Sequence, residues 1–94
     1  MTALYSVEFT SEAKKQIKKL DHYEAILILS WIHKNIEGCM DPRAHGKALT
    51  AQFKECWRYR VGNYRLIAKI EDERILILIL SIGHRRDIYK KYHL

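Results

Sequence analysis

The chain has 94 residues, 48% of them hydrophobic and 30% charged, and a formal net charge of +6. This length allows a single domain, residues 1–94, and the high content of apolar side chains excludes intrinsic disorder. The longest apolar stretch, residues 75–82, is too short to span a bilayer, so we expect no membrane partner.

The first part of the chain predicts one strand and two helices. Residues 5–9 alternate apolar and polar side chains with a period of two, which is typical of a strand. Thr10 offers a cap to a lysine-rich helix over residues 11–20, and Asp21 with Glu24 forms a capping-box pattern before a second helix. The positions of the second helix expected to face the core are Ala25, Ile28, Leu29, Ile32 and Ile36.

The remainder predicts mostly sheet. Gly38 suits the end of the second helix, and residues 39–53 predict a loop or a short irregular helix. Residues 56–61 and 64–70 are expected to be strands joined by a two-residue hairpin loop of glycine and asparagine. A turn at Asp72 and Glu73 leads into the continuous apolar run 75–82, which is typical of a central strand.

Gly83 ends this strand, and residues 87–92 are expected to form a short helical turn. The order β-α-α-β-β-β predicts an α+β fold. Two N-terminal helices would pack on one face of a small, twisted, mainly antiparallel sheet, with the short helical turn at the C-terminus.

All seven arginines lie after residue 40, in the part of the chain that carries the whole net charge. Arginine suits bidentate phosphate contacts, so this distribution favours a polyanionic partner. The hairpin register places Arg60 directly opposite Arg65, with Arg58 and Lys69 on the same face. Opposed like charges are destabilising, and a bound polyanion would compensate their repulsion. The alternative is a solvated sheet face.

Continuing this register through the turn at Asp72 and Glu73 places Leu80 beside Arg65, with an apolar strip on the arginine face. The strip consists of Leu76, Leu78, Leu80 and Ile82. The same alternation carries His84 and Arg85 to the hairpin turn, where they would converge with the arginines on one corner. An apolar strip beside arginines predicts a partner segment with apolar anchors and acidic side chains.

Cys39 and Cys56 have the spacing neither of a CxxC motif nor of a disulfide framework. We therefore expect a reduced, cytoplasmic protein without a metal site. Four lysines of the first helix recur at helical spacing and form either a solvated face or a contact with nucleic acid. They are Lys14, Lys15, Lys18 and Lys19.

Two segments carry more specific motifs, WRYRVGNYRLI at residues 57–67 and SIGHRRDIY at residues 81–89. Together with residues 7–20, they resemble the RelE/ParE superfamily of toxins from toxin–antitoxin modules. The pair of motifs YR and GHRRDIY resembles the RelE branch. This resemblance implies a ribosome-dependent endoribonuclease that cuts mRNA without a metal or cofactor. It also implies a cognate antitoxin that inhibits the enzyme. Operator DNA would be bound only indirectly, through this antitoxin.

The resemblance also implies roles for individual residues. Arg65 would bind the scissile phosphate, and Arg85 would bind phosphate or protonate the leaving group. Tyr89 would stack on a base and help to orient the 2′-hydroxyl, while His84 stands where some branches place a catalytic histidine. The other side chains expected to bind RNA are Arg58, Arg60, Lys69 and Arg86.

One departure from the family pattern concerns Arg58 and Arg60, which stand where founding members usually have lysines. Arginine stays protonated and is a poor general base, so these side chains suit charge stabilisation instead. Histidine is the residue type whose reference pKa lies near 7, so His84 is then the candidate proton-transfer group, either as the base or as the acid. A surface or structural histidine is the alternative.

Two other functions fit the same resemblance. Gyrase-poisoning toxins share the fold and bind an enzyme instead of cleaving RNA. A degenerate member would be a binding module without catalytic activity. The full set of basic and aromatic residues favours the nuclease, for which the four lysines of the first helix are candidate contacts with ribosomal RNA.

Overall fold

Five strands and three α-helices follow one another along residues 4–49 and 55–92, the part of the chain that the computed structural model describes. In chain order they are β1 (Ser6–Phe9), α1 (Ser11–Lys19), α2 (His22–Asn35), β2 (Lys47–Ala48), β3 (Cys56–Val61), β4 (Tyr64–Glu71), the 3-10 helix η2 (Asp72–Arg74), β5 (Leu76–His84) and α3 (Arg85–Tyr92). The α+β class is confirmed. No helix in these ranges is long and apolar enough to cross a membrane.

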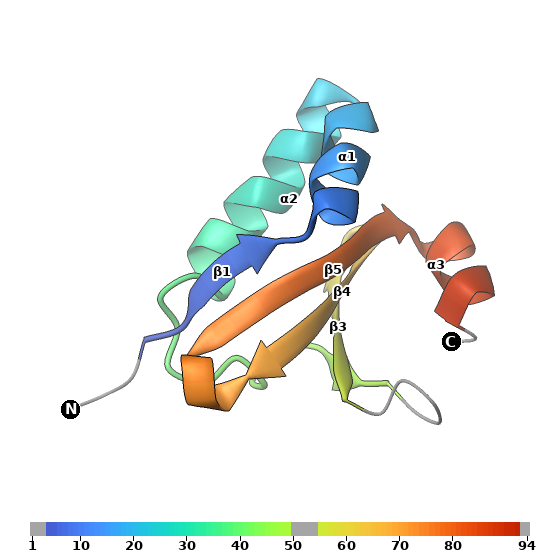
Figure 1. Cartoon of the computed structure of the whole chain (residues 1–94). Coiled ribbons are helices and arrows are strands. Elements are labelled where there is room, and N and C mark those ends of the chain that lie inside the picture. Colours follow the sequence, from blue (N-terminus) through green and yellow to red (C-terminus); the bar gives the residue numbers. More distant parts are fainter. Residues whose placement is uncertain (1–3, 50–54, 93–94) are drawn as a thin grey trace.

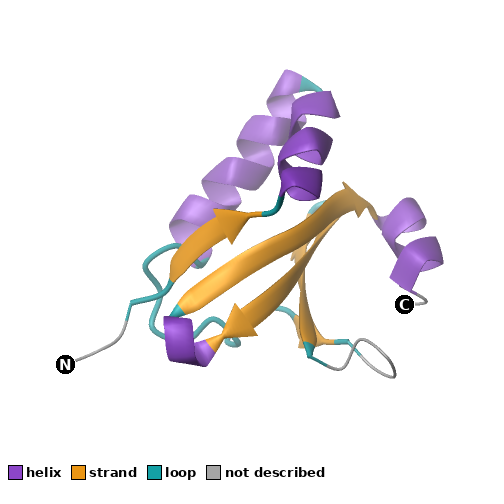
Figure 2. Cartoon of the chain, in the orientation of Figure 1, coloured by secondary structure: helices purple, strands orange, loops and turns teal. Residues whose placement is uncertain are grey.

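The strands form one mixed sheet in the order β1-β5-β4-β3-β2 (Figure 2). β1 and β5 are parallel, and the other neighbouring pairs are antiparallel. The α1–α2 hairpin lies on one side of the sheet, and α3 lies beyond the end of β5 (Figure 1). The main core joins α1 and α2 to one sheet face, and a smaller cluster of Leu49, Ile67 and Ile88 lies under α3 on the other face.

Both N-terminal helices begin where the sequence predicts. The hydroxyl of Thr10 accepts a hydrogen bond from the Ala13 N–H and caps α1. Asp21 occupies the cap position of α2, but its side chain makes no cap hydrogen bond, so the predicted capping box is incomplete. On α2, Ile28 and Ile32 are buried as predicted, whereas Leu29 is 44% exposed and does not belong to the core.

The hairpin register is confirmed, because β3 and β4 pair Arg60 with Arg65 and Trp57 with Ala68. The register predicted for β5 is wrong for two reasons. The turn is longer than two residues, because it contains η2 and the left-handed Ile75. The first pair of β4 and β5 after the turn is therefore Glu71 with Leu76. A bulge then follows, at which Ile67 pairs with Ser81 and Ala68 with Ile79, so that Leu80 has no partner in β4.

The bulge moves the end of β5 to the opposite face from the predicted one, because one extra residue exchanges the two sides of a strand. Ile82 is 2% exposed and belongs to the main core instead of an arginine-side strip. Leu76 is buried as well, and Leu78 and Leu80 are half-buried. The predicted apolar strip on β5 is therefore wrong for Ile82 alone. Leu76 and Leu78 keep the predicted face, and Leu80 packs against the cluster under α3.

The segment predicted as a loop over residues 39–53 contains β2, which pairs with β3 at the sheet edge; its residues 50–53 lie outside the described part. Just before β2, Gly46 has a φ of +80°, and a Cβ atom there would stand 2.1 Å from the carbonyl oxygen of Arg58. The C-terminal turn is also longer than predicted: α3 begins at Arg85, and residues 93–94 lie beyond the described residues.

We predict that Gly46→Ala destabilises the protein more than Gly38→Ala does. Both positions have a positive φ, which costs an alanine about 1–2 kcal/mol. A Cβ at Gly38 would have open space, whereas the Cβ at Gly46 would overlap the β3 backbone, which adds about 1–3 kcal/mol. Chemical denaturation of the two variants measures the difference, and equal losses would contradict the close approach of β2 and β3.

Candidate functional site

Arg65, near the start of β4, is buried although it is charged. Only 3% of its surface is exposed. Its Nη1 atom donates hydrogen bonds of 2.9 Å to the carbonyl oxygens of Gly62 and Tyr64 in the same hairpin. Its Nε atom is buried, with no hydrogen-bond partner in the part of the chain that the structure describes. The hairpin therefore holds a fixed positive charge within the protein.

This arrangement changes the interpretation of the opposed arginines. Arg60 is exposed to solvent, whereas the guanidinium of Arg65 is held by two backbone carbonyl oxygens. Carbonyl dipoles stabilise a buried guanidinium, and solvent screens an exposed one. The pair is thus accommodated by the protein itself, and the repulsion does not require a bound polyanion.

Tyr89 of α3 lies over Arg65. The Cζ atom of Arg65 is 5.7 Å from the centre of the Tyr89 ring, which is within the range of a cation–π contact. The Arg65 guanidinium lowers the pKa of the Tyr89 hydroxyl, and the charges of Arg58 and Arg85 lower it further. We call these four residues, from β3, β4 and α3, the arginine–tyrosine site.

Three contacts around the hairpin and the end of β5 hold the first part of α3. The Arg85 N–H donates a 2.8 Å hydrogen bond to the carbonyl oxygen of Asn63 in the hairpin turn. Ile88 is buried against Ile67 in the smaller core cluster. A Cβ at Gly83 would lie 3.0 Å from the Ile88 side chain, so a glycine at this point lets the helix pack closely.

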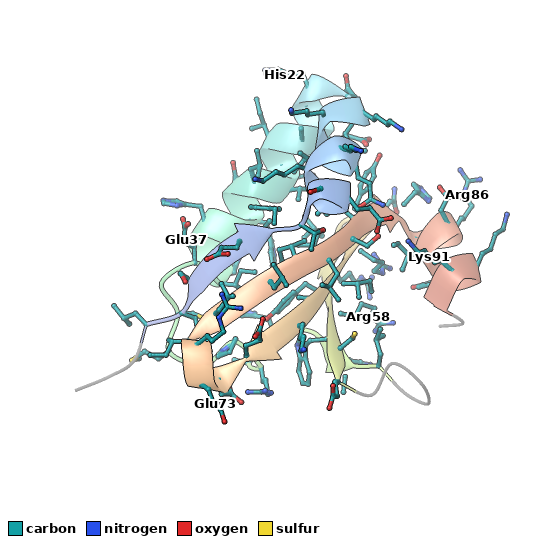
Figure 3. All side chains as sticks on the ribbon, in the orientation of Figure 1. His22, Glu37, Arg58, Glu73, Arg86 and Lys91 are labelled. Carbon is teal, nitrogen blue, oxygen red and sulfur yellow. The ribbon has the colours of Figure 1, made fainter. Side chains whose placement is uncertain are left out.

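The other predicted RNA-binding side chains surround this site unevenly. Arg60 and Arg86 are exposed. Figure 3 shows Arg58 to the left of the lower part of α3 and Arg86 on the upper side of that helix. Lys69 lies farther along β4, where with Arg43 and Arg74 it lines a separate cavity of about 770 Å³. The structure therefore does not bring Lys69 to the arginine–tyrosine site.

His84 lies on the opposite side of the sheet from the predicted one, as a result of the bulge. It pairs with Tyr64, and the two rings meet edge to face with their centres 5.7 Å apart. The Tyr64 hydroxyl donates a hydrogen bond to the Glu24 carboxylate, which raises the pKa of Tyr64 to about 12. The Nδ1 atom of His84 accepts a hydrogen bond of 3.3 Å from the Arg86 N–H.

Gln16, which the sequence did not single out, holds the end of β5 beyond the last residue of β1. Its Oε1 atom accepts a 2.6 Å hydrogen bond from the Ile82 N–H, and its Nε2 atom donates to the Ser81 hydroxyl. The Thr10 hydroxyl donates to the carbonyl oxygen of Leu80. One signal in the sequence could have indicated this role: Gln16 is a polar residue beside Ala13 and Ile17, on the face of α1 that packs on the sheet.

The four lysines of α1 are all exposed. They lie on a helix that packs on the main-core face of the sheet (Figure 1). The first turn of this helix reaches α3, where Glu12 forms an ion pair with Lys91. Within the described ranges, no three His, Cys, Asp or Glu side chains are close enough to hold a metal ion.

A family model and a curated relative cover almost the whole chain. The model of the ParE toxin of type II toxin–antitoxin systems, parDE, matches residues 7–89. The toxin RelG of Mycobacterium tuberculosis is 30% identical over 87 residues, which make up 93% of this chain and 98% of that toxin. The matched region includes the hairpin, β5 and Tyr89.

Solved structures share the fold. The toxin–antitoxin complex RelBE2 from Mycobacterium tuberculosis contains a chain that superposes with a TM-score of 0.80 at 27% identity, covering 90% of this chain and 95% of that one. The isolated RelE toxin of Escherichia coli superposes with a TM-score of 0.62 at 20% identity, covering 96% of this chain and 99% of that one. The second likeness shows the fold alone.

We predict that Tyr89 ionises at a lower pH than Tyr64. Cationic arginines favour the Tyr89 phenolate, whereas the Glu24 carboxylate holds the proton on Tyr64 up to about pH 12. NMR titration of protein labelled with 13C-tyrosine measures both values. Raising the salt concentration should raise the pKa of Tyr89, because ions screen the exposed arginines.

The matched control for this titration is Glu24→Gln. It should lower the pKa of Tyr64 and leave that of Tyr89 unchanged, because the two phenols have different charged neighbours. A Tyr89 that titrates at or above the ordinary value near 10 would contradict the arginine–tyrosine site.

Proposed function

Because the chain belongs to the ParE toxin family of type II toxin–antitoxin systems, we propose that it acts as a RelE-like endoribonuclease that cleaves mRNA on the ribosome. One observation carries this proposal. Arg65 lies against the Tyr89 ring, and the charges of Arg58 and Arg85 are close enough to lower the pKa of the Tyr89 hydroxyl further. A cationic site with one aromatic side chain suits a phosphate next to a nucleobase.

Cleavage next to a 2′-hydroxyl without a metal requires a proton acceptor, stabilisation of the charge on the phosphate, and a proton donor. In the proposal, the exposed Arg85 and the half-buried Arg58 contact the scissile phosphate. Arg65 supplies a fixed positive charge against the Tyr89 ring and orients this ring through the cation–π contact. Tyr89 stacks on a base, and its hydroxyl lies close to the reacting 2′-oxygen.

The RNA would continue over the exposed arginines on either side. Arg60 extends the cationic surface along β3, and Arg86 extends it along α3. Lys69 lies on the α3 side of the sheet but toward its other end, so in this proposal it contacts mRNA outside the cleaved dinucleotide.

The proposed partners are the ribosome and a cognate antitoxin in the cytoplasm. The similar chain from Mycobacterium tuberculosis was solved as part of a toxin–antitoxin complex, which supports an antitoxin here. Acidic antitoxin side chains would bind the arginines that otherwise bind phosphate. In this arrangement the antitoxin and mRNA compete for the arginine–tyrosine site.

A second candidate function is inhibition of DNA gyrase without RNA cleavage. The matching family model is that of the ParE toxin, which favours keeping this alternative. The two functions make different demands on the arginine–tyrosine site, because a protein that only binds gyrase does not have to stabilise a reacting phosphate.

We predict that Arg85→Ala lowers the rate of mRNA cleavage on programmed ribosomes about a hundredfold, the usual scale for losing a group that stabilises transition-state charge. The backbone hydrogen bond from residue 85 to Asn63 survives this change, so α3 should stay in place. Arg74→Ala, which removes an exposed arginine at the far end of the sheet, is the matched control and should cleave normally.

The same preparations would be tested for inhibition of gyrase supercoiling. Cleavage by the control variant but not by Arg85→Ala supports the nuclease. Wild-type protein that inhibits gyrase and leaves ribosome-bound mRNA intact would overturn it in favour of the second candidate function.

We further propose that the lysine face of α1 contacts ribosomal RNA. Its four members are exposed and lie on α1, whereas the arginine–tyrosine site is built from β3, β4 and α3, so they could add contacts beyond those of the site. Replacing all four by glutamine should weaken ribosome binding and flatten its dependence on salt, because fewer counterions are released. Co-sedimentation across a salt series measures both effects. Curves that coincide with those of wild type would show a solvated face.

A further inference from the structure

His84 occupies the residue directly before α3, which is the N-cap position of that helix. Its backbone is extended at the end of β5, as is usual for an N-cap residue. Its Nδ1 atom accepts a hydrogen bond from the N–H of Arg86, the second residue of the helix. Side-chain acceptors at the N-cap bond this N–H or the next one, so the imidazole does here what serine or asparagine does elsewhere.

This hydrogen bond limits what the ring can do in a proton transfer. The Nδ1 lone pair is engaged by the Arg86 N–H, so in the neutral ring the proton is assigned to Nε2. A ring in this form has no free lone pair with which to accept the proton of a 2′-hydroxyl. Protonating Nδ1 instead would break the cap and add a positive charge at a helix N-terminus, beside Arg85 and Arg86.

The ring is also held from its other side. Tyr64 meets it edge to face, and Tyr64 is bonded in turn to the Glu24 carboxylate on α2. The charged groups nearest in the chain are Arg85, Arg86 and Asp87 at the start of α3. These contacts orient the imidazole toward the helix end rather than toward Tyr89 and Arg65.

The start of α3 matters because the helix is short. It has eight residues, about two turns, and a helix of this length depends on its cap and its packing. Tyr89 lies one turn after Arg85, so a shift at the first turn moves the phenol relative to the buried Arg65 guanidinium. Besides the cap, the Arg85 N–H and the buried Ile88 hold this turn.

We propose that His84 is a positioning residue: it caps α3 through Nδ1 and so keeps the Tyr89 ring over Arg65, and it does not transfer a proton in the reaction. The placement of Tyr89 is independent of the proposed function. Only the consequence for RNA cleavage rests on that function.

Two variants separate the contacts of the ring. His84→Asn keeps a cap acceptor and removes the aromatic ring, whereas His84→Phe keeps an aromatic ring against Tyr64 and removes the acceptor. The first readout is the pKa of Tyr89, measured by NMR on full-length protein labelled with 13C-tyrosine. Asparagine should keep this pKa low, whereas phenylalanine should raise it toward the ordinary value as the phenol leaves the guanidinium.

Thermal unfolding should follow the same order. His84→Phe should lower the Tm by about 4 °C or more, the usual scale for loss of a cap in a domain of this size, and His84→Asn should lower it less. A Tyr89 pKa that stays low in His84→Phe, or that rises equally in both variants, would overturn the cap assignment without any assay of activity.

The second readout is cleavage of ribosome-bound mRNA, measured for all proteins in the same buffer. We expect His84→Asn to cleave at least tenfold faster than His84→Phe, because asparagine restores the position of Tyr89. Equal losses of a hundredfold or more, with the Tyr89 pKa unchanged in His84→Asn, would show that the ring transfers a proton. If wild type cleaves nothing, the proposed function fails while the Tyr89 titration still decides the role of His84.

Discussion

The bulge at Leu80 determines how the rest of the site is arranged. It adds one residue to β5 relative to β4, so the side chains after it exchange faces. Ile82 consequently fills the main core, and His84 meets Tyr64 on the same side of the sheet. After His84, the Arg85 N–H bonds the hairpin turn at Asn63, and α3 packs on the other face of the sheet. Without the extra residue, His84 and Tyr89 would lie on one side.

The elements with local signals were predictable from the sequence. Period-two alternation identified β1, the hydroxyl of Thr10 marked the start of α1, and a glycine-asparagine turn determined the β3–β4 register. β2 has two residues and carries no periodic pattern. β5 is a continuous apolar run, so no alternation indicates which of its side chains face the helices. For that reason the face of His84 could not be predicted. The contact of Tyr89 with Arg65 was not predicted either, because no residue pattern placed α3 over the hairpin.

The arginine–tyrosine site combines a buried charge with exposed ones. Arg65 is held by carbonyl oxygens of the hairpin, so its charge is present whether or not a ligand is bound. Arg58 and Arg85 reach solvent and are screened by ions. A site built in this way needs little rearrangement when an anion arrives, because its most costly charge has already been desolvated within the fold. Sequence alone indicates that arginines gather there, but not which of them is buried.

The side chains of Thr10 and Gln16 occupy the edge of β5 where β1 has ended. An unpaired strand edge is a template on which a strand of another molecule can add, and chains that expose one tend to aggregate or exchange segments. Here, Gln16 of α1 supplies an acceptor for the Ile82 N–H, and the N-cap residue Thr10 supplies a donor for the Leu80 carbonyl. The backbone groups that would recruit a foreign strand are therefore already bonded. An intruding strand would have to lift the first helix away before it could pair with the apolar centre of the sheet.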